Sequence, residues 1–177
     1  AYRDEAISVG NALQEYALNK GVLVNATSWD DDGVYQDPIA LTSYFDLPAM
    51  QRLAAYDTEW SGIEQTHAVL LEDAAYGNGL YRFRYNTATQ QFFTETSLDS
   101  IHQLFIANYL AEAGYTARAQ ESLYFFKTTY NTTDRIAGAY TPAGVADSPY
   151  EDIAIYSLAA SLAHWLDDDG FEQAMLD

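Results

Sequence analysis

Apolar residues recur at spacings of three and four through most of the sequence, a pattern that predicts α-helices. The first stripe ends before Gly21 and contains Ala6, Val9, Leu13, Tyr16 and Ala17. Similar stripes follow in the segments 47–54, 60–74, 98–109, 119–130, 153–163 and 171–175. Helices of similar length separated by glycines and short loops are typical of antiparallel helical hairpins arranged in a ring or a layer. The pattern therefore predicts an all-α fold.

The segment 80–93 departs from helical spacing. Leu80–Tyr85 alternates aliphatic or aromatic residues with basic ones, Asn86–Thr89 is turn-like, and Gln91–Phe93 resumes the apolar pattern. Alternation on both sides of a turn predicts a small β-hairpin. The sequence contains no internal linker, low-complexity segment or fixed-period repeat. We therefore treat residues 1–177 as a single unit.

A helix start is predicted at Ser148-Pro149-Tyr150-Glu151. In this interpretation Ser148 is the N-cap, Pro149 occupies the first helical position, and Glu151 completes a capping box. The last long helix would then begin directly after Ser148.

The charge of the chain excludes several classes of partner. The 26 acidic residues outnumber the 8 basic ones and give a net charge of −18. Nucleic acids and anionic membrane surfaces would be repelled by this field. No apolar run is long enough to span a bilayer, so membrane insertion is not expected. Neutral ligands such as sugars remain compatible, and the 15 Tyr residues suit both sugar contacts and helix packing.

Cysteine is absent, which removes disulfides, thiolate catalysis and cysteine-based zinc sites. This composition fits an exported protein, and we expect an extracellular or cell-surface location in a bacterium. The start of the chain carries no signal peptide. It also lacks an initiator Met, and Ala1–Glu5 resembles a helix interior. We therefore expect the chain to be a piece of a longer one.

The sequence predicts no metal site and no cofactor. None of the three His residues is spaced with a second His or a carboxylate as metal ligands are. His67 and His164 lie on helical faces beside apolar residues, where a structural role is expected. Asp30–Gly33 lacks the alternating acids and terminal Glu of an EF-hand, so a solvated loop is favoured over a calcium loop. Nucleotide-binding and serine-nucleophile motifs are also absent.

Asp99 is the carboxylate with the most distinctive position, because it follows a loop and opens a helix in the segment 96–100. Two interpretations remain open from position alone. An acid in the first turn of a helix often acts only as a cap. The same location also directs a carboxylate toward a site formed by helix N-termini.

Several segments together resemble glycoside hydrolase family 8. Trp29, Asp37-Pro38 and the run Leu41–Ala49, with Arg52 three residues later, resemble the family's Trp…Asn-Pro-Ser-Tyr-Phe-x-Pro-Ala…Arg-x-Phe-Ala segment. The later features agree in order. They are Trp60, Gly79-Leu80-Tyr81, the Leu98-Asp99-Ser100-Ile101-His102 counterpart of a Tyr-Asp-Ala-x-Arg motif, and a loop with Gly138-Ala139-Tyr140.

The resemblance implies a toroid of antiparallel helical hairpins and an inverting endo-glycosidase that acts on β-linked polysaccharide. It implies that Asp99 is the general base and that Trp29, Tyr44 and Tyr140 line the sugar site. His102 stands where the family has Arg, and it could support Asp99 through a hydrogen bond or a positive charge. Leu98 replaces the family's Tyr.

The chain resembles only the C-terminal half of the family's toroid, whose general acid belongs to the N-terminal half. We therefore expect an incomplete toroid that is inactive in isolation. Its partners would be an oligo- or polysaccharide and either the missing half or a self-associated copy. Two other interpretations remain: a non-catalytic glycan-binding relative, or another helical-toroid hydrolase or lyase in which Asp99 is only a cap.

Overall fold

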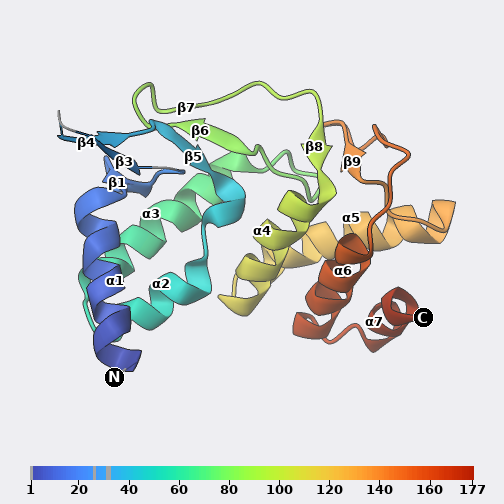
Figure 1. Cartoon of the computed structure of the whole chain (residues 1–177). Helices are drawn as coiled ribbons and strands as arrows, with labels where there is room; N and C mark the ends of the chain where they lie inside the picture. The colour runs from blue at the N-terminus through green and yellow to red at the C-terminus, as the bar shows by residue number, and fades with distance from the viewer. Residues whose placement is uncertain (1, 26, 31–32) are drawn as a thin grey trace. The chain divides into compact units, whose positions relative to one another are not determined.

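The computed structural model describes residues 2–25, 27–30 and 33–177. These residues gather into two compact units, one formed by Ala1–Asp73 with Arg84–Phe93 and the other by Ala74–Phe83 with Thr94–Asp177. Helices dominate both, as the sequence predicted, and the strands are short (Figure 1). Within the described residues, no helix combines the length and the apolar character that crossing a membrane requires.

The first unit contains three helices and several short antiparallel strand pairs. Its helices are α1 (Tyr2–Tyr16), α2 (Leu47–Ala54) and α3 (Glu59–Ala74), and a 3-10 turn η1 (Thr42–Tyr44) precedes α2. Its strands are β1 (Leu18–Asn19), β2 (Val22–Leu23), β3 (Thr27–Asp30), β4 (Gly33–Gln36), β5 (Ile39–Leu41), β6 (Arg84–Asn86) and β7 (Gln91–Phe92). The core of the unit contains Phe45, Met50, Trp60 and His67.

The predicted β-hairpin is confirmed over part of its length. Strands β6 and β7 pair antiparallel, with Tyr85 opposite Phe92, and β5 adds a third strand beside β6. Leu80–Phe83 lies outside these strands. Another segment differs from the prediction, because the expected polar loop around Trp29 contains the antiparallel pair β3 and β4. Asp31 and Asp32 lie outside the described residues.

Helix α1 packs through a face that the sequence pattern did not identify. Val9 is 59% exposed, whereas Gly10 is buried. A Cβ atom on Gly10 would lie 3.3 Å from both Leu53 Cδ2 and Trp60 Nε1. The predicted stripe agrees with the structure at Leu13 and Ala17, which are half-buried, but not at Ala6 and Val9, which are exposed, because the helices approach closely at a residue without a side chain.

The second unit is a group of four helices with one small strand pair. Its elements are β8 (Leu98–Asp99), α4 (Ser100–Glu112), α5 (Thr116–Thr133), β9 (Ala139–Tyr140), α6 (Ile153–Trp165) and α7 (Asp169–Leu176). Helix α4 packs against α5 and α6, and α7 packs against α6. The buried Asn108 of α4 joins two helices, because its Nδ2 donates to the carbonyl oxygens of Leu104 at 2.8 Å and Leu158 at 3.0 Å.

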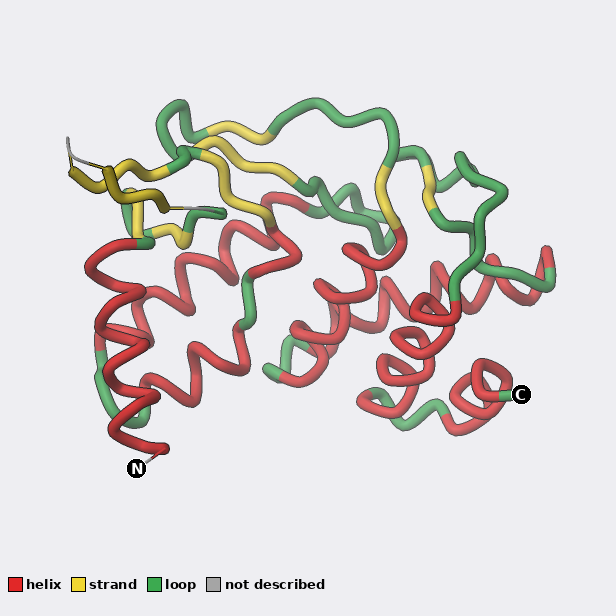
Figure 2. The backbone as a smooth tube through the Cα atoms, in the orientation of Figure 1, coloured by secondary structure: helices red, strands yellow, loops and turns green. Residues whose placement is uncertain are grey.

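Helix α6 begins at Ile153, so the predicted start at Ser148 was wrong. The Asp152 carboxylate accepts the Ala154 N–H at 2.7 Å and is the N-cap. Ser148 Oγ instead accepts the Tyr150 N–H at 3.1 Å within the preceding loop. Both Ser and Asp are good caps, and the chain uses the later one. Figure 2 shows the strands β8 and β9 (yellow) near the N-terminal ends of α4 and α6.

Candidate functional site

Asp99 sits where the strand pair β8–β9 meets the first turn of α4. Leu98 pairs with Tyr140 and Asp99 with Ala139 in antiparallel register. The side chain of Leu98 is 1% exposed and anchors β8 in the core, whereas Asp99 on the opposite face of the strand is exposed. Successive side chains of a strand point to opposite faces, so burial of Leu98 directs Asp99 toward solvent.

Ser100 fixes the strand pair to the start of the helix. Its Oγ donates to the Ala137 carbonyl oxygen at 2.6 Å, and its backbone N–H donates to the Gly138 carbonyl oxygen at 2.9 Å. Ser100 is fully buried. These two bonds join Ser100, the residue after Asp99, to Ala137 and Gly138, which lie just before β9. The backbone on the C-terminal side of Asp99 is therefore held in place.

The Asp99 carboxylate is held by one of its two oxygens. Oδ1 accepts the Ile101 N–H at 2.9 Å and the His102 N–H at 3.4 Å, which makes Asp99 the N-cap of α4. Within the described part of the chain, Oδ2 accepts no hydrogen bond. The N–H groups and the positive end of the helix dipole favour a negative charge at this position. The carboxylate is thus held through Oδ1, and the residue is exposed to solvent.

His102 lies one turn into α4, and its ring is half-buried. The imidazole packs on Phe83 with ring centroids 4.3 Å apart and planes 32° apart. Its backbone N–H is the longer of the two donors to Asp99. The predicted support of Asp99 by the His102 ring stays a prediction.

Tyr140 lies next to Asp99 in the strand pair, but its ring is in the core. The residue is 1% exposed, and its ring meets Phe125 and Phe126 edge to face. Its hydroxyl oxygen accepts the Ala137 N–H at 2.9 Å. Burial raises the pKa of this phenol. In this environment Tyr140 supports the loop that holds Asp99, and its ring has no open face for a sugar.

Tyr150, a neighbour of Asp99, and its partner Asp152 are residues that the sequence interpretation missed. Tyr150 is 57% exposed, and its hydroxyl donates to Asp152 Oδ2. This hydrogen bond is the main reason why the pKa of Tyr150 is raised and that of Asp152 is lowered. The Coulomb effect of Asp99 adds to the rise for Tyr150. Only Asp152 had a signal in the sequence, as an alternative N-cap to Ser148.

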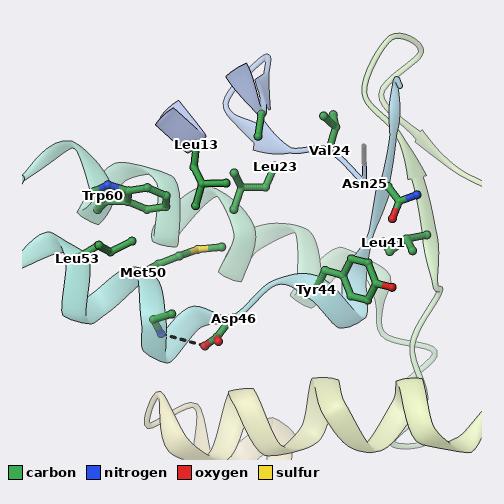
Figure 3. Close-up of a pocket in the computed structure, with 12 residues that line it drawn as sticks. Leu13, Leu23, Val24, Asn25, Leu41, Tyr44, Asp46, Met50, Leu53 and Trp60 are labelled. Carbon is green, nitrogen blue, oxygen red and sulfur yellow. Dashed lines mark hydrogen bonds between the residues drawn. The ribbon is translucent and has the colours of Figure 1, made fainter. Parts of the chain in front are cut away.

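Tyr44, in the first unit, ends η1 beside a pocket of about 250 Å³ (Figure 3). Apolar side chains of α1, α2 and α3 line the pocket, among them Leu13, Met50 and Trp60. The carboxylate of Asp46 accepts the Ala49 N–H at 2.9 Å and caps α2 at the pocket wall. Tyr44 is 58% exposed, and its role in binding stays a prediction.

The remaining predicted residues divide between the two units. Trp29 lies in β3 of the first unit, and its side chain is outside the described ones. Asp99, His102 and Tyr140 are brought together in the second unit. No cluster of three His, Asp or Glu side chains suited to a metal ion occurs in the ranges that the structure describes.

Comparison with known proteins identifies the fold. No protein-family model and no curated protein sequence matches the chain. Among solved structures, an alpha-amylase from Clostridium perfringens matches with a TM-score of 0.90 and 24% identity over 99% of this chain and 51% of its own. A cold-adapted family 8 xylanase matches with a TM-score of 0.72 and 12% identity over 99% of this chain and 49% of its own.

A D-mannose isomerase also matches, with a TM-score of 0.67 and 12% identity over 95% of this chain and 48% of its own.

These likenesses confirm the predicted fold class, a partial toroid of helical hairpins with small strand pairs. The chain spans about half the length of each of these three solved structures. The matched proteins include two glycoside hydrolases and an isomerase, so the fold alone does not select a reaction. The selection has to come from the residues around Asp99.

Proposed function

We propose that this chain is part of the catalytic domain of an inverting glycoside hydrolase that acts on polysaccharide, with Asp99 as its general base. The observation that carries the proposal is how the Asp99 carboxylate is held and exposed. One oxygen is fixed by the N–H groups of Ile101 and His102, and the residue is exposed at the first turn of α4. The fold likeness to a family 8 xylanase and an alpha-amylase supports the same reaction class.

The chemistry of inversion explains the role of such a carboxylate. A general base removes a proton from water as the water attacks the anomeric carbon, while an acid protonates the leaving oxygen. The two carboxyl groups stand roughly 6.5–9.5 Å apart so that the water fits between them. In Asp99, Oδ1 would hold the group in place and Oδ2 would accept the proton. The acid would come from residues beyond this chain.

Substrate contacts are proposed at Tyr44 and Trp29. Tyr44 presents an exposed ring beside an apolar pocket, a combination that suits the C–H face of a sugar. Burial of Tyr140 favours a packing role for that residue instead. The net charge of −18 favours a neutral polysaccharide over an anionic one. The likeness to a xylanase favours a β-linked substrate. Because the chain also resembles an alpha-amylase, an α-linked glucan has to be tested beside it.

The proposal includes a partner for the exposed apolar side chains. Tyr2 is 90% exposed and Val9 59% exposed on α1, and Ile153 and Leu176 are 83% and 64% exposed in the second unit. Large contiguous apolar patches usually mark interaction surfaces, and we propose that these side chains belong to such surfaces. The missing half of the domain or a second copy of the chain would cover them. An extracellular or cell-surface location is part of the same proposal, since polymeric substrates lie there.

The test is a substrate screen that also reads the stereochemistry. The full-length protein is incubated with xylan, mixed-linkage β-glucan and starch, and reducing ends are measured. Proton NMR of the first products then gives the anomer. We expect hydrolysis of one polymer with inverted configuration. Retained configuration would contradict the base role of Asp99, and glycan binding without hydrolysis would favour the non-catalytic alternative.

A further inference from the structure

Tyr150 is tied to the Asp99 site through the backbone of Gly138. The Gly138 N–H donates to the Tyr150 carbonyl oxygen at 2.6 Å, and the Gly138 carbonyl oxygen accepts the Ser100 N–H at 2.9 Å. Ser100 directly follows Asp99 in the sequence. Two consecutive hydrogen bonds therefore connect the backbone of Tyr150 with the first turn of α4.

The ring of Tyr150 lies directly against Gly138, the residue that makes both of these hydrogen bonds. A Cβ atom on Gly138 would stand 2.8 Å from Tyr150 Cδ1 and 3.0 Å from the Tyr150 carbonyl oxygen. Real Cβ atoms do not approach other atoms so closely, so the ring occupies its place only because residue 138 has no side chain. The electrostatic effect of Asp99 on the Tyr150 phenol agrees with this proximity.

Asp152 fixes the other end of the Tyr150 side chain. Its Oδ2 accepts the Tyr150 hydroxyl, and its Oδ1 accepts the Ala154 N–H and caps α6. Helix α6 packs against α4, which Asp99 caps. The Tyr150 ring is thus held at its backbone and at its hydroxyl by elements that also position Asp99, and yet the residue is 57% exposed.

An exposed aromatic ring in a fixed conformation is a good contact for a sugar. It offers a flat apolar face, and little side-chain freedom remains to be lost when a ligand binds. The hydroxyl oxygen has lone pairs for a sugar hydroxyl, since its own proton is directed to Asp152. The nearby carboxylates of Asp99 and Asp152 disfavour an anionic ligand.

We propose that Tyr150 is a sugar-contacting residue of the Asp99 site and that Asp152 is the positioning residue that holds its phenol. This inference rests on the proposed glycoside hydrolase function. It names two residues that the family resemblance did not supply, and its ligand is a neutral oligosaccharide.

Two substitutions of Asp152 separate its two roles. Asn caps a helix as well as Asp does, and its Nδ2 can still reach Tyr150 by donating to the hydroxyl oxygen in place of the bond that Oδ2 accepts, whereas Ser caps well but is too short to reach the ring. In the full-length protein, we expect Asp152→Asn to keep a KM near that of the wild type. Asp152→Ser should raise KM about tenfold with a smaller change in kcat, equivalent to a loss of about 1.4 kcal/mol in binding. Both variants should have similar Tm values.

Tyr150→Ala should weaken binding of the substrate oligosaccharide at least as much as Asp152→Ser. The affinity is measured by isothermal titration with xylohexaose, a mixed-linkage β-glucan oligosaccharide and maltohexaose. Tyr124→Ala is the matched control, because Tyr124 is 74% exposed on α5 and has no part in the site. It should bind as the wild type does.

The outcomes distinguish this inference from the proposed function. If Asp99→Asn abolishes turnover but Tyr150→Ala binds and reacts like the wild type, the role of Tyr150 is wrong and the proposed function stands. Equal KM values for Asp152→Asn and Asp152→Ser would overturn the positioning role. If the wild-type protein neither binds nor hydrolyses any of the three oligosaccharides, both proposals fail.

Discussion

The imidazole Nε2 of His67 accepts the backbone N–H of Leu23 at 3.0 Å. The other ring nitrogen, Nδ1, lies 2.7 Å from the Ile63 carbonyl oxygen. Both contacts are satisfied only by the neutral tautomer that carries its proton on Nδ1. His67 is fully buried, and burial lowers its pKa from 6.5 to about 4, against an opposing effect of the Ile63 hydrogen bond. This histidine therefore joins α3 to β2 only while it is uncharged.

Folding stability should decrease as the pH falls from about 6.5 to about 4. In that window the unfolded chain binds a proton at His67 and the folded chain does not, so protons favour the unfolded state. Above pH 6.5 the contribution is fully present, and below pH 4 the dependence on this group ends. A shift of this size corresponds to about 3 kcal/mol. Chemical denaturation at pH 7 and pH 4.5 measures it.

Carboxylates also titrate in this range, so the comparison needs a variant that lacks the imidazole. His67→Gln keeps an acceptor for the Leu23 N–H and does not titrate, and its stability should depend less on pH. His164→Gln is the control, because the His164 side chain is 71% exposed. An identical pH dependence in the wild type and His67→Gln would rule out this role for His67.

The second prediction compares Gly79, which packs closely against α5 in the second unit, with Gly77, which does not. Both have positive φ angles, +87° and +79°. A Cβ atom on Gly79 would lie 2.4 Å from the Glu121 carbonyl oxygen, whereas one on Gly77 meets nothing within 4 Å. Gly77→Ala should cost about 1–2 kcal/mol for the backbone conformation alone. Gly79→Ala should cost about 1–3 kcal/mol more because of crowding.

The free energy of unfolding of the two glycine variants, measured by urea denaturation, decides this point. Equal losses would mean that the backbone at Gly79 moves away from α5 without cost.

The helices could be predicted because apolar residues recur at helical spacing, as in α2, where Leu47 and Met50 are buried. The exceptions have physical causes. Helix α1 packs through Gly10, and a residue without a side chain adds nothing to an apolar pattern. Helix α6 begins after Asp152 because two good caps compete in one segment. The two-residue strands β8 and β9 are too short to carry alternation, and their pairing depends on contacts distant in sequence.

The site was predictable only in part. Asp99 has a local signal, because an acid that opens a helix is visible in the sequence. Tyr150 has none, because its position depends on the bond between Gly138 and Tyr150, twelve residues apart. The burial of Tyr140 also depends on tertiary packing, against Phe125 and Phe126. The assignment of residues 1–177 to a single unit stays a prediction.

Tyr44→Ala should weaken oligosaccharide binding by the full-length protein about tenfold without unfolding it, because the ring is exposed beside an apolar pocket. Tyr56→Ala is the matched control, with 50% exposure in the same unit. Isothermal titration gives the affinity, and circular dichroism reports the fold. A loss of helical signal in Tyr44→Ala would favour a packing role for this residue.

The isolated 177-residue chain should self-associate through its exposed apolar side chains. Val9, 59% exposed on α1, is a suitable probe. Val9→Asp should lower the average mass measured by sedimentation equilibrium, because a charge at a buried contact is costly. Val69→Asp, at a position 50% exposed on α3, controls for the added charge. A monomeric wild-type chain would contradict the expectation of a covering partner.

The turnover of Asp99→Asn on the substrate of the full-length protein tests the central claim most directly. Asn is a good N-cap, so the Tm should change little. It cannot accept a proton from water, and loss of a general base costs about 10²–10⁴-fold in rate. Asp134→Asn, an exposed aspartate at the end of α5, should react like the wild type. A fall in kcat of that size with substrate binding retained is the predicted result, and wild-type turnover by Asp99→Asn would contradict the account.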